Sequence, residues 1–254
     1  MTQSILRTLD GPIMTLAIDR QNRKNALTVE MYDALTQHID DANANDDIRV
    51  IVLTGEGPDF SSGNDLHDFL ENPPRDMNSP VFRFINAVRL SEKPIVAAVE
   101  GLAVGIGTTI LLHCDLVYAA DNARFKLPFV DLGVTPEAGS SYLLPQNFGY
   151  QRAAELLLLC PIFDTQTAQE AGFVTKIVGA GEARAAAMKT AKILAEKAPL
   201  ALRRAKALMK TDGDTLEQRM ATEAEMFGKG LEGSEFKEAV DAFSNKRKPN
   251  FYKK

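Results

Sequence analysis

The chain has 254 residues, 45% of them hydrophobic and 25% charged, which is the balance of an ordinary folded protein. Its 17 glycines and 12 prolines are too few for a low-complexity chain, and its two cysteines, Cys114 and Cys160, have no CxxC neighbour that would indicate a disulfide framework or a zinc site. The 29 Lys and Arg residues against 34 Asp and Glu residues give a net charge of −5, which argues against a nucleic-acid partner. An anionic ligand must therefore be held by local positive charge.

The sequence contains no signal that directs the protein to a membrane or out of the cell. The N-terminus lacks a basic segment followed by an apolar stretch, and the C-terminus carries no peroxisomal or retention signal. The most apolar stretch, residues 101–114, is shorter than the roughly 18–20 residues of a spanning helix, so we expect a buried helix there. The three histidines lack metal-binding spacing. We expect a cytoplasmic protein with no membrane partner and no metal site.

The first 180 residues predict alternating strands and helices. Thr28 is placed to cap a helix, Pro80 to begin another, and Gly105 to precede a third that runs to about residue 113. A short helical turn is expected over residues 65–70. Strands are expected at residues 13–18, 49–54, 95–99 and 116–119. Apolar strands separated by helices indicate a mainly parallel α/β core that is covered on both faces.

From residue 182 onward the pattern is almost purely helical. Helices are expected up to residue 197 and then over residues 199–210, 215–227 and 234–243. A helical region of this size has little core of its own, so it must pack against the α/β part or another subunit. We therefore divide the chain into an α/β core, residues 1–180, and a C-terminal helical region, residues 181–254.

Two glycine-containing loops are candidates for a ligand site. Gly105, Ile106 and Gly107 follow a strand and open a helix, but Ile110 stands where a dinucleotide-binding loop has its third glycine. Bare N–H groups at this helix start can instead stabilise an oxyanion. The loop at residues 60–66 can supply a second donor, the N–H of Asn64. Each loop alone is equally well explained as an ordinary tight turn.

An ordered set of motifs resembles the enoyl-CoA hydratase/isomerase (crotonase) superfamily over nearly the whole chain. The motifs occupy residues 25–27, 60–66, 93–101, 114–115 and 242–247. The resemblance implies an α/β fold that is a crotonase-like spiral of ββα turns, with a C-terminal helical region that builds a homotrimer or a hexamer. It implies an acyl-CoA thioester substrate and no separate cofactor, since coenzyme A is part of the substrate. The family's oxyanion-hole positions match the N–H groups of Asn64 and Ile106.

The catalytic positions depart from those of the hydratases. Hydratases of this family add water with two glutamates, and the matching positions here are Thr109 and Phe129. Residues 128–142 are instead similar to the Δ3,Δ2-enoyl-CoA isomerase branch, whose single catalytic glutamate matches Glu137. One base is enough to move a proton from C2 to C4 of an acyl thioester. The alternative for Glu137 is a first-turn glutamate favoured by the helix dipole.

The resemblance also implies a set of substrate contacts. Lys24 and Ala26 match the region that meets the CoA nucleotide, and Lys246 lies in a C-terminal basic run that approaches CoA, often from a neighbouring subunit. Around the acyl thioester we expect Ser62, Asp65, Leu66, Gly105, Phe129 and Val134. We further expect Phe129, Val134 and Tyr142 to form an apolar wall that raises the Glu137 pKa.

The favoured hypothesis is an isomerase that shifts the double bond of a 3-enoyl-CoA to the 2-trans position through a thioester enolate, in unsaturated fatty-acid oxidation. One alternative is an enoyl-CoA hydratase or another crotonase-type reaction, including a hydratase that uses Asp131. A second alternative is a non-catalytic acyl-CoA-binding or RNA-binding protein. The preferred acyl chain length and the choice between trimer and hexamer stay open.

Overall fold

The computed structural model describes residues 4–211 and 213–252 and divides the chain into two compact units, residues 1–191 and 192–254. The boundary falls within helix α8 (Ala183–Ala195), later than the position at residue 180 suggested by the sequence. The first part of α8 is attached to the α/β unit, because Met188 accepts a hydrogen bond from Thr15 and Thr190 shares one with Tyr118. Helical sequence alone does not reveal which unit a helix packs against.

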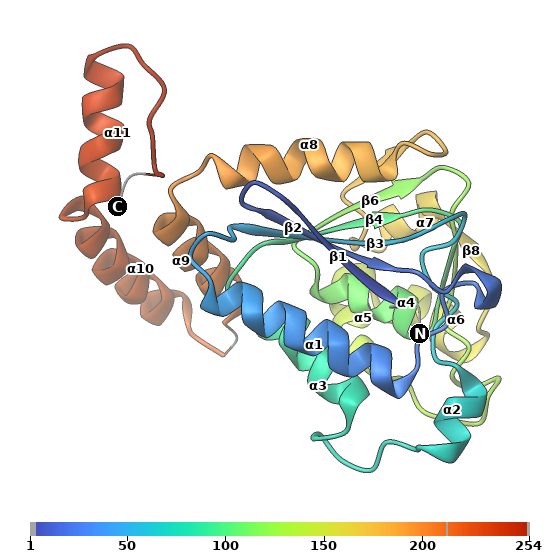
Figure 1. Cartoon of the computed structure of the whole chain (residues 1–254). Helices are drawn as coiled ribbons and strands as arrows, with labels where there is room; N and C mark the ends of the chain where they lie inside the picture. Colours follow the sequence, from blue (N-terminus) through green and yellow to red (C-terminus); the bar gives the residue numbers. More distant parts are fainter. Residues whose placement is uncertain (1–3, 212, 253–254) are drawn as a thin grey trace. The chain divides into compact units, whose positions relative to one another are not determined.

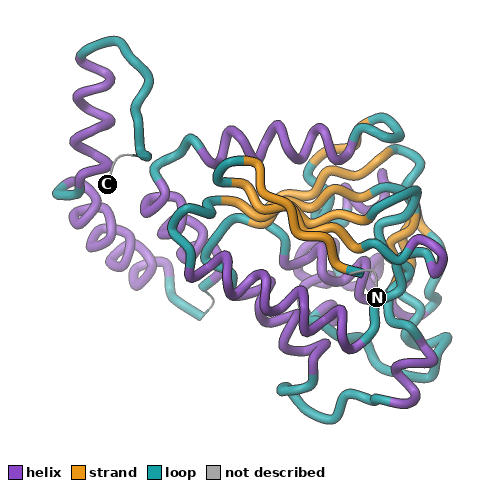
Figure 2. The backbone as a smooth tube through the Cα atoms, viewed as in Figure 1, coloured by secondary structure: helices purple, strands orange, loops and turns teal. Residues whose placement is uncertain are grey.

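The first unit is built on a six-stranded sheet, in which only the first pair of strands is antiparallel (Figures 1 and 2). Gly11, at φ +56°, forms the tight turn that joins this pair. The strands, in their order across the sheet, are β1 (Ile5–Asp10), β2 (Ile13–Ile18), β3 (Val50–Gly55), β4 (Ile95–Val99), β6 (Leu116–Ala120) and β9 (Lys176–Val178). The mainly parallel sheet expected from the sequence is confirmed.

A second, three-stranded sheet lies in the same unit. It contains β5 (Leu102–Val104), β7 (Arg124–Lys126) and β8 (Phe163–Asp164). The rings of Phe125 on β7 and Phe163 on β8 pack with the ring of Phe173, with centroids 5.6 to 6.4 Å apart. The sequence did not predict these strands, nor β1 and β9, because most are only two or three residues long and β1 is exposed along most of its length.

Helices cover both faces of the six-stranded sheet: α1 and α3 lie on one face and α8 on the other (Figure 1). Thr28 caps α1 by accepting from the Met31 N–H, and Pro80 begins α3, both as predicted. The helices that precede α8 are α1 (Val29–Ala44), α2 (Leu66–Glu71), α3 (Pro80–Leu90), α4 (Ile106–Thr109), α5 (Ser140–Phe148), α6 (Tyr150–Leu158) and α7 (Thr165–Glu170), with 3-10 turns at η1 (Gln21–Arg23) and η2 (Ile110–His113).

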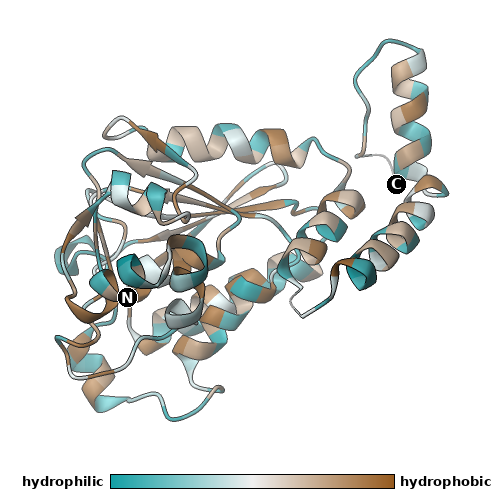
Figure 3. Cartoon of the chain, turned by 180° about the vertical axis from the view of Figure 1, so that it is seen from behind, coloured by the Kyte–Doolittle hydropathy of each residue, from teal (hydrophilic) through white to brown (hydrophobic). Residues whose placement is uncertain are grey.

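The core of this unit lies between the sheet and α1 and α3. Strands β3 and β4 are buried almost throughout, and Figure 3 shows the sheet strands as predominantly hydrophobic while the helices alternate between hydrophobic and hydrophilic turns. The ring of Tyr32 on α1 packs against Phe84 on α3, with centroids 5.6 Å apart. Tyr32 is thus a buried polar residue in an otherwise apolar layer.

The second unit consists of the end of α8 followed by α9 (Pro199–Lys210), α10 (Leu216–Leu231) and α11 (Ser234–Ser244). Thr215 and Gln218 form a capping box at the start of α10, and Arg247 pairs with Glu238 and Asp241. Several large apolar side chains are exposed along α10 and α11: Leu216, Met220, Phe227, Phe236, Val240 and Phe243. The helices were expected, and their role in building a trimer stays a prediction. No helix in the described part of the chain is long and apolar enough to cross a membrane.

Candidate active site

The two glycine-containing loops are in direct backbone contact. Val104 donates an N–H to Ser61 O, and Ser61 donates to Leu102 O, at 2.9 Å each. A Cβ on Gly63 would lie 2.6 Å from Val104 O, and one on Gly107 would lie 2.7 Å from Ser61 O. Only glycine allows this approach, and Gly63 also has φ +89°. The sequence predicted both loops, and the structure brings them together.

Each loop carries a backbone N–H that its own secondary structure does not use. The bridge between Leu27 and Asn64 is made by Leu27 N–H to Gly63 O and by Asp65 N–H to Leu27 O, at 2.8 Å each, so the Asn64 N–H takes no part in it. Ile106 is the first residue of α4, and its N–H has no partner within the helix. These are the two donors that the sequence identified.

Glu137 lies three residues before the first residue of α5, so it is not a first-turn residue of that helix, and several contacts fix its backbone. Ser140 donates both its N–H and its hydroxyl to Glu137 O, at 3.0 and 2.7 Å. The Nε2 of His113 lies 2.7 Å from Ala138 O. Ala138 has φ +53°, an uncommon value for a residue with a Cβ. The carboxylate is therefore presented from a loop whose backbone is held at Glu137 and Ala138.

The carboxylate of Glu137 is shielded from water and held on one side only. Its Oε1 accepts a hydrogen bond from the Thr109 hydroxyl, whereas Oε2 is buried and has no hydrogen-bond partner within residues 4–211 and 213–252. Burial raises the pKa of Glu137 to about 7, and the hydrogen bond from Thr109 acts in the opposite direction. A carboxyl group with this pKa can accept and return a proton near neutral pH.

Tyr32 connects α1 to both parts of the site. It is fully buried, and its hydroxyl donates to the side-chain Oδ1 of Asn64. Burial, and then the nearby charges of Glu137 and Asp68, raise the Tyr32 pKa, so the hydroxyl keeps its proton. The sequence analysis did not identify Tyr32. A tyrosine in the apolar stripe of α1 is a signal that could have done so, because a buried hydroxyl needs a partner.

The apolar wall expected around Glu137 is only partly present. Phe129 is buried, at 6% exposure, but Val134 and Tyr142 are 56% and 58% exposed in the single chain. Val134 lies in a turn closed by hydrogen bonds such as Val134 N–H to Phe129 O, and its side chain is exposed there. Contact of Val134 or Tyr142 with the carboxylate or with substrate stays a prediction. In the single chain the Thr109 hydroxyl is the group bonded to the carboxylate.

Asp65 and Ala26, two expected substrate contacts, have structural partners. The Oδ2 of Asp65 lies 2.7 Å from an Arg20 nitrogen, and its Oδ1 accepts the N–H groups of His67 and Asp68 that begin α2. Arg20 also donates to Ala26 O at 3.0 Å, and its hydrogen bond lowers the Asp65 pKa. These contacts hold the loop that carries Asn64. A direct contact of either residue with a ligand stays a prediction.

The other expected substrate contacts lie on the same loops or beyond them. Lys24 is exposed, and its carbonyl accepts the Ser62 N–H at 2.9 Å, so these two residues are neighbours. Leu66 is exposed at the start of α2, and Gly105 precedes the start of α4. Lys246 belongs to the second unit, so its contact with CoA stays a prediction.

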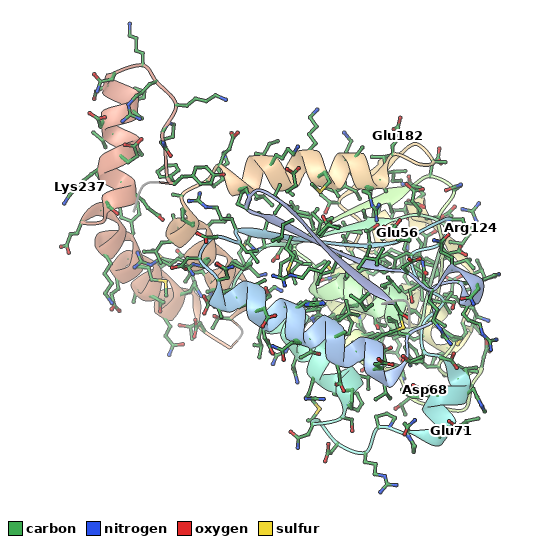
Figure 4. All side chains as sticks on the ribbon, viewed as in Figure 1. Glu56, Asp68, Glu71, Arg124, Glu182 and Lys237 are labelled. Atoms are coloured by element: carbon green, nitrogen blue, oxygen red, sulfur yellow. The ribbon has the colours of Figure 1, made fainter. Side chains whose placement is uncertain are left out.

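A pocket of about 340 Å³ opens beside Tyr32. Val29, Phe69 and Val81 give it apolar lining, and Glu71 and Arg75 add charge. Glu71 lies on α2 together with Asp68, whose carboxylate accepts the Val29 N–H at 2.7 Å (Figure 4).

Elsewhere, Asp131 is exposed and paired with Lys126 at 2.8 Å, so the structure gives no support to its use as a base. The described residues include no group of three or more His, Cys, Asp or Glu side chains arranged to hold a metal.

The fold and the two loops define a crotonase-type protein, and the comparisons with known proteins agree. A sequence model of the enoyl-CoA hydratase/isomerase family matches residues 9–254. The chain belongs to this family. It is also similar to a protein of Magnetospirillum magneticum AMB-1 that carries the description enoyl-CoA hydratase/carnithine racemase, with a TM-score of 0.96 and 43% identity over 100% of both chains.

Relatives with different activities resemble the chain to a similar degree. The 1,2-epoxyphenylacetyl-CoA isomerase of Escherichia coli is 32% identical over 99% of both chains. The enoyl-CoA delta isomerase 2 of Rattus norvegicus is 38% identical over 69% of this chain, but the match covers only 46% of that protein. The 2,3-dehydroadipyl-CoA hydratase of Escherichia coli is 31% identical over 94% of both chains. The family includes isomerases and hydratases, so the reaction must be argued from the site.

Proposed function

We propose that this protein is a Δ3,Δ2-enoyl-CoA isomerase, which converts a 3-enoyl-CoA to the 2-trans isomer. The observation that carries the proposal is the Glu137 carboxylate, buried beside the two loops with its pKa raised to about 7. At the positions that match the hydratase glutamates, Thr109 carries a hydroxyl and Phe129 a hydrocarbon ring. Neither group activates a water molecule as a base at neutral pH, so one carboxylate must do all the proton transfer.

The reaction needs one base and two hydrogen-bond donors. Glu137 takes a proton from C2; the C2–H bond breaks, its electron pair forms a C1–C2 double bond, and the thioester carbonyl oxygen becomes negative, which gives the dienolate. The Asn64 and Ile106 N–H groups donate to this oxygen, and each such donor typically lowers the barrier by about 2.7–4 kcal/mol. Glu137 then returns the proton to C4: the C3–C4 double-bond pair forms the new C–H bond, the double bond moves to C2–C3, and the thioester carbonyl is restored. No electrons enter or leave, so the reaction requires no redox cofactor.

The surroundings of the site suit an acyl-CoA thioester. In the proposed complex, exposed Lys24, beside the loop at residues 60–66, contacts the anionic CoA nucleotide. Lys246, in the C-terminal basic run, adds a second positive charge to this contact. The pocket beside Tyr32 receives the acyl chain beyond C4. The exposed apolar side chains of α10 and α11 form subunit contacts in a homotrimer or hexamer, which light scattering in solution would measure.

One experiment separates the proposed function from its competitors. The purified protein is incubated with a 3-enoyl-CoA and, separately, with a 2-enoyl-CoA. With 3-enoyl-CoA, formation of the conjugated double bond is followed as a gain of ultraviolet absorbance. With 2-enoyl-CoA, hydration is followed as the loss of that absorbance. Conjugation without hydration supports the isomerase, whereas hydration of the 2-enoyl-CoA as the main activity contradicts it. Binding of both thioesters without turnover would indicate a binding protein.

Substitution of the base tests its assignment. Glu137→Gln keeps the size of the side chain and removes the basic carboxylate, so isomerisation should fall by about a thousandfold, within the usual hundredfold to ten-thousandfold contribution of a general base. Acyl-CoA binding, measured by calorimetry, should be retained. The control is Glu155→Gln, because Glu155 lies on α6, away from both glycine loops in the chain. Substantial isomerase activity in Glu137→Gln would contradict the role of Glu137.

A further inference from the structure

The two carboxylate oxygens of Glu137 have different surroundings. Oε1 accepts the hydroxyl proton of Thr109, and Oε2 has no hydrogen-bond partner in the described part of the chain, although it is shielded from solvent. Two such oxygens do not share a proton equally, because the hydrogen bond stabilises negative charge on Oε1 and leaves the lone pairs of Oε2 unoccupied. The asymmetry depends on a single hydroxyl group.

Thr109 is itself firmly placed. Its side chain is fully buried, and its N–H donates to Gly105 O at 2.9 Å within the first turn of α4. A threonine on a helix has few allowed side-chain orientations, and full burial holds the Thr109 side chain in the one that directs its hydroxyl to Glu137. The neighbouring hydroxyl of Thr108 bonds a different acceptor, Ala103 O, at 2.5 Å. Of these two adjacent hydroxyls, only that of Thr109 bonds the carboxylate.

We propose that Thr109 is a positioning residue for the reaction: its hydroxyl holds Oε1 of Glu137 so that Oε2 is the oxygen that takes the proton from C2 and returns it to C4. This inference rests on the proposed isomerase function. It gives a chemical role to a position where the hydratases carry a glutamate. The threonine hydroxyl does not itself remove a proton, but it fixes the one carboxylate that does.

The same hydrogen bond controls when Glu137 is a base. Burial favours the neutral acid, and the Thr109 hydroxyl favours the carboxylate. Without the hydroxyl, both oxygens are buried without a described partner, so the carboxylate exists only at higher pH. The titratable groups that face this region from the other elements are Tyr32 on α1, which keeps its proton, and His113 on η2, which bonds Ala138 O.

Three variants test the inference. Thr109→Val preserves the branched shape and removes the hydroxyl, and Thr109→Ser restores a hydroxyl at the same carbon. Thr108→Val is the matched control, since it deletes a buried hydroxyl from the same helix without touching Glu137. The primary readout is the side-chain carboxyl resonance of Glu137 in ¹³C-labelled protein, because it reports this group alone, and it is identified by its loss in Glu137→Gln.

The inference predicts that the titration midpoint of Glu137 rises by about one pH unit in Thr109→Val, while Thr109→Ser and Thr108→Val keep the wild-type midpoint. With 3-enoyl-CoA, the pH profile of kcat/KM for Thr109→Val should shift to higher pH by the same amount as the titration midpoint. The plateau kcat of this variant should fall about tenfold, with KM little changed. An unchanged midpoint in folded Thr109→Val would overturn the inference. If Thr109→Val does not fold, Thr109→Ala is measured in its place with the same expectation.

The resonance titration keeps this inference separate from the proposed function. If the wild-type protein does not isomerise 3-enoyl-CoA, the proposed function fails regardless of the behaviour of Thr109. If wild-type protein isomerises and the Thr109→Val midpoint rises without any loss of plateau kcat, Thr109 sets the Glu137 pKa but does not orient the carboxylate, and the positioning role is contradicted.

Discussion

The hydroxyl of Tyr32 on α1 donates a hydrogen bond to the side-chain oxygen of Asn64, which lies 32 positions later in the chain. The Asn64 backbone N–H is one of the two proposed donors to the thioester oxygen. Because the Tyr32 ring is buried and packed on Phe84, its hydroxyl is held by the hydrophobic core. The core between α1 and α3 thus fixes the loop that carries one donor.

Tyr32→Phe should therefore slow the reaction without unfolding the protein. The ring stays in place, but the side-chain oxygen of Asn64 loses its donor and the loop can shift. We expect kcat to fall about tenfold, which corresponds to about 1.4 kcal/mol of barrier, with little change in KM. Tyr150→Phe, a change at an exposed tyrosine, is the control. A wild-type kcat in Tyr32→Phe would show that the loop does not depend on this hydroxyl.

The pH dependence of the reaction should follow the pKa of Glu137. Glu137 removes a proton only as a carboxylate, and its pKa in the folded protein is about 7. The value of kcat/KM for a 3-enoyl-CoA should accordingly rise with pH, reach half its maximum near pH 7 and then level off, because kcat/KM reports the free enzyme. Steady-state rates between pH 5 and pH 9, the range that brackets this pKa, would check this. A midpoint near 4.5, the ordinary glutamate value, would contradict it.

Glu137 should also destabilise the fold at high pH. The pKa of Glu137 is about 7 in the folded protein, whereas the ordinary glutamate value of 4.5 applies to the unfolded chain. The folded protein therefore holds this proton more tightly. The resulting stabilisation is complete below pH 4.5 and is lost as the pH rises through 7. Above pH 7, Glu137→Gln should be more stable than wild type by up to about 3 kcal/mol, and the difference should shrink toward pH 5. Urea unfolding of both proteins at a pH above 7 and at pH 5 measures this difference in stability. An equal difference at both would show that Glu137 does not titrate as proposed.

A methyl group at Gly63 should separate the two loops. The new Cβ would lie 2.6 Å from Val104 O, at a position where φ is +89°. Gly63→Ala should lower stability by a few kcal/mol and reduce kcat at least tenfold, because the Asn64 and Ile106 donors move apart. Gly11→Ala is the matched control: its φ is +56°, but nothing lies within 4 Å of the added carbon. It should lose some stability and keep its kcat. Equal kcat in both variants would contradict the importance of the loop contact.

Two substitutions at Asp65 separate its structural role from substrate binding. Asp65→Asn retains an oxygen that caps α2 and loses the charge paired with Arg20, whereas Asp65→Ala loses both. Asp65→Ala should melt at a lower temperature than Asp65→Asn. Because Arg20 lowers the Asp65 pKa, the stability from this pair is complete above pH 3.8 and is lost as the pH falls through the lower, folded pKa. A large rise in KM for Asp65→Asn, with no change in melting, would instead favour direct substrate contact.

Much of the fold follows from local sequence. Thr28 caps α1, Pro80 begins α3, and the apolar run at residues 95–99 forms β4, all where the sequence predicts them. These predictions succeed because caps, proline geometry and apolar runs act over a few neighbouring residues. The short strands of the second sheet were missed because pairing with distant strands, rather than their own sequence, makes them strands.

The sequence by itself determined the chemical groups of the site: one glutamate at residue 137, a hydroxyl and a phenyl ring at the positions of the hydratase glutamates, and glycines that leave N–H groups available in two loops. Tertiary structure decided which of these groups meet. It placed the Thr109 hydroxyl on Glu137, bonded Tyr32 to Asn64, left Val134 and Tyr142 exposed in the single chain, and paired Asp65 with Arg20. The reason is physical: burial raises the pKa of Glu137 and a hydrogen bond from Thr109, 28 positions earlier in the chain, lowers it. Together they leave it near 7, and both arise only when the chain is packed.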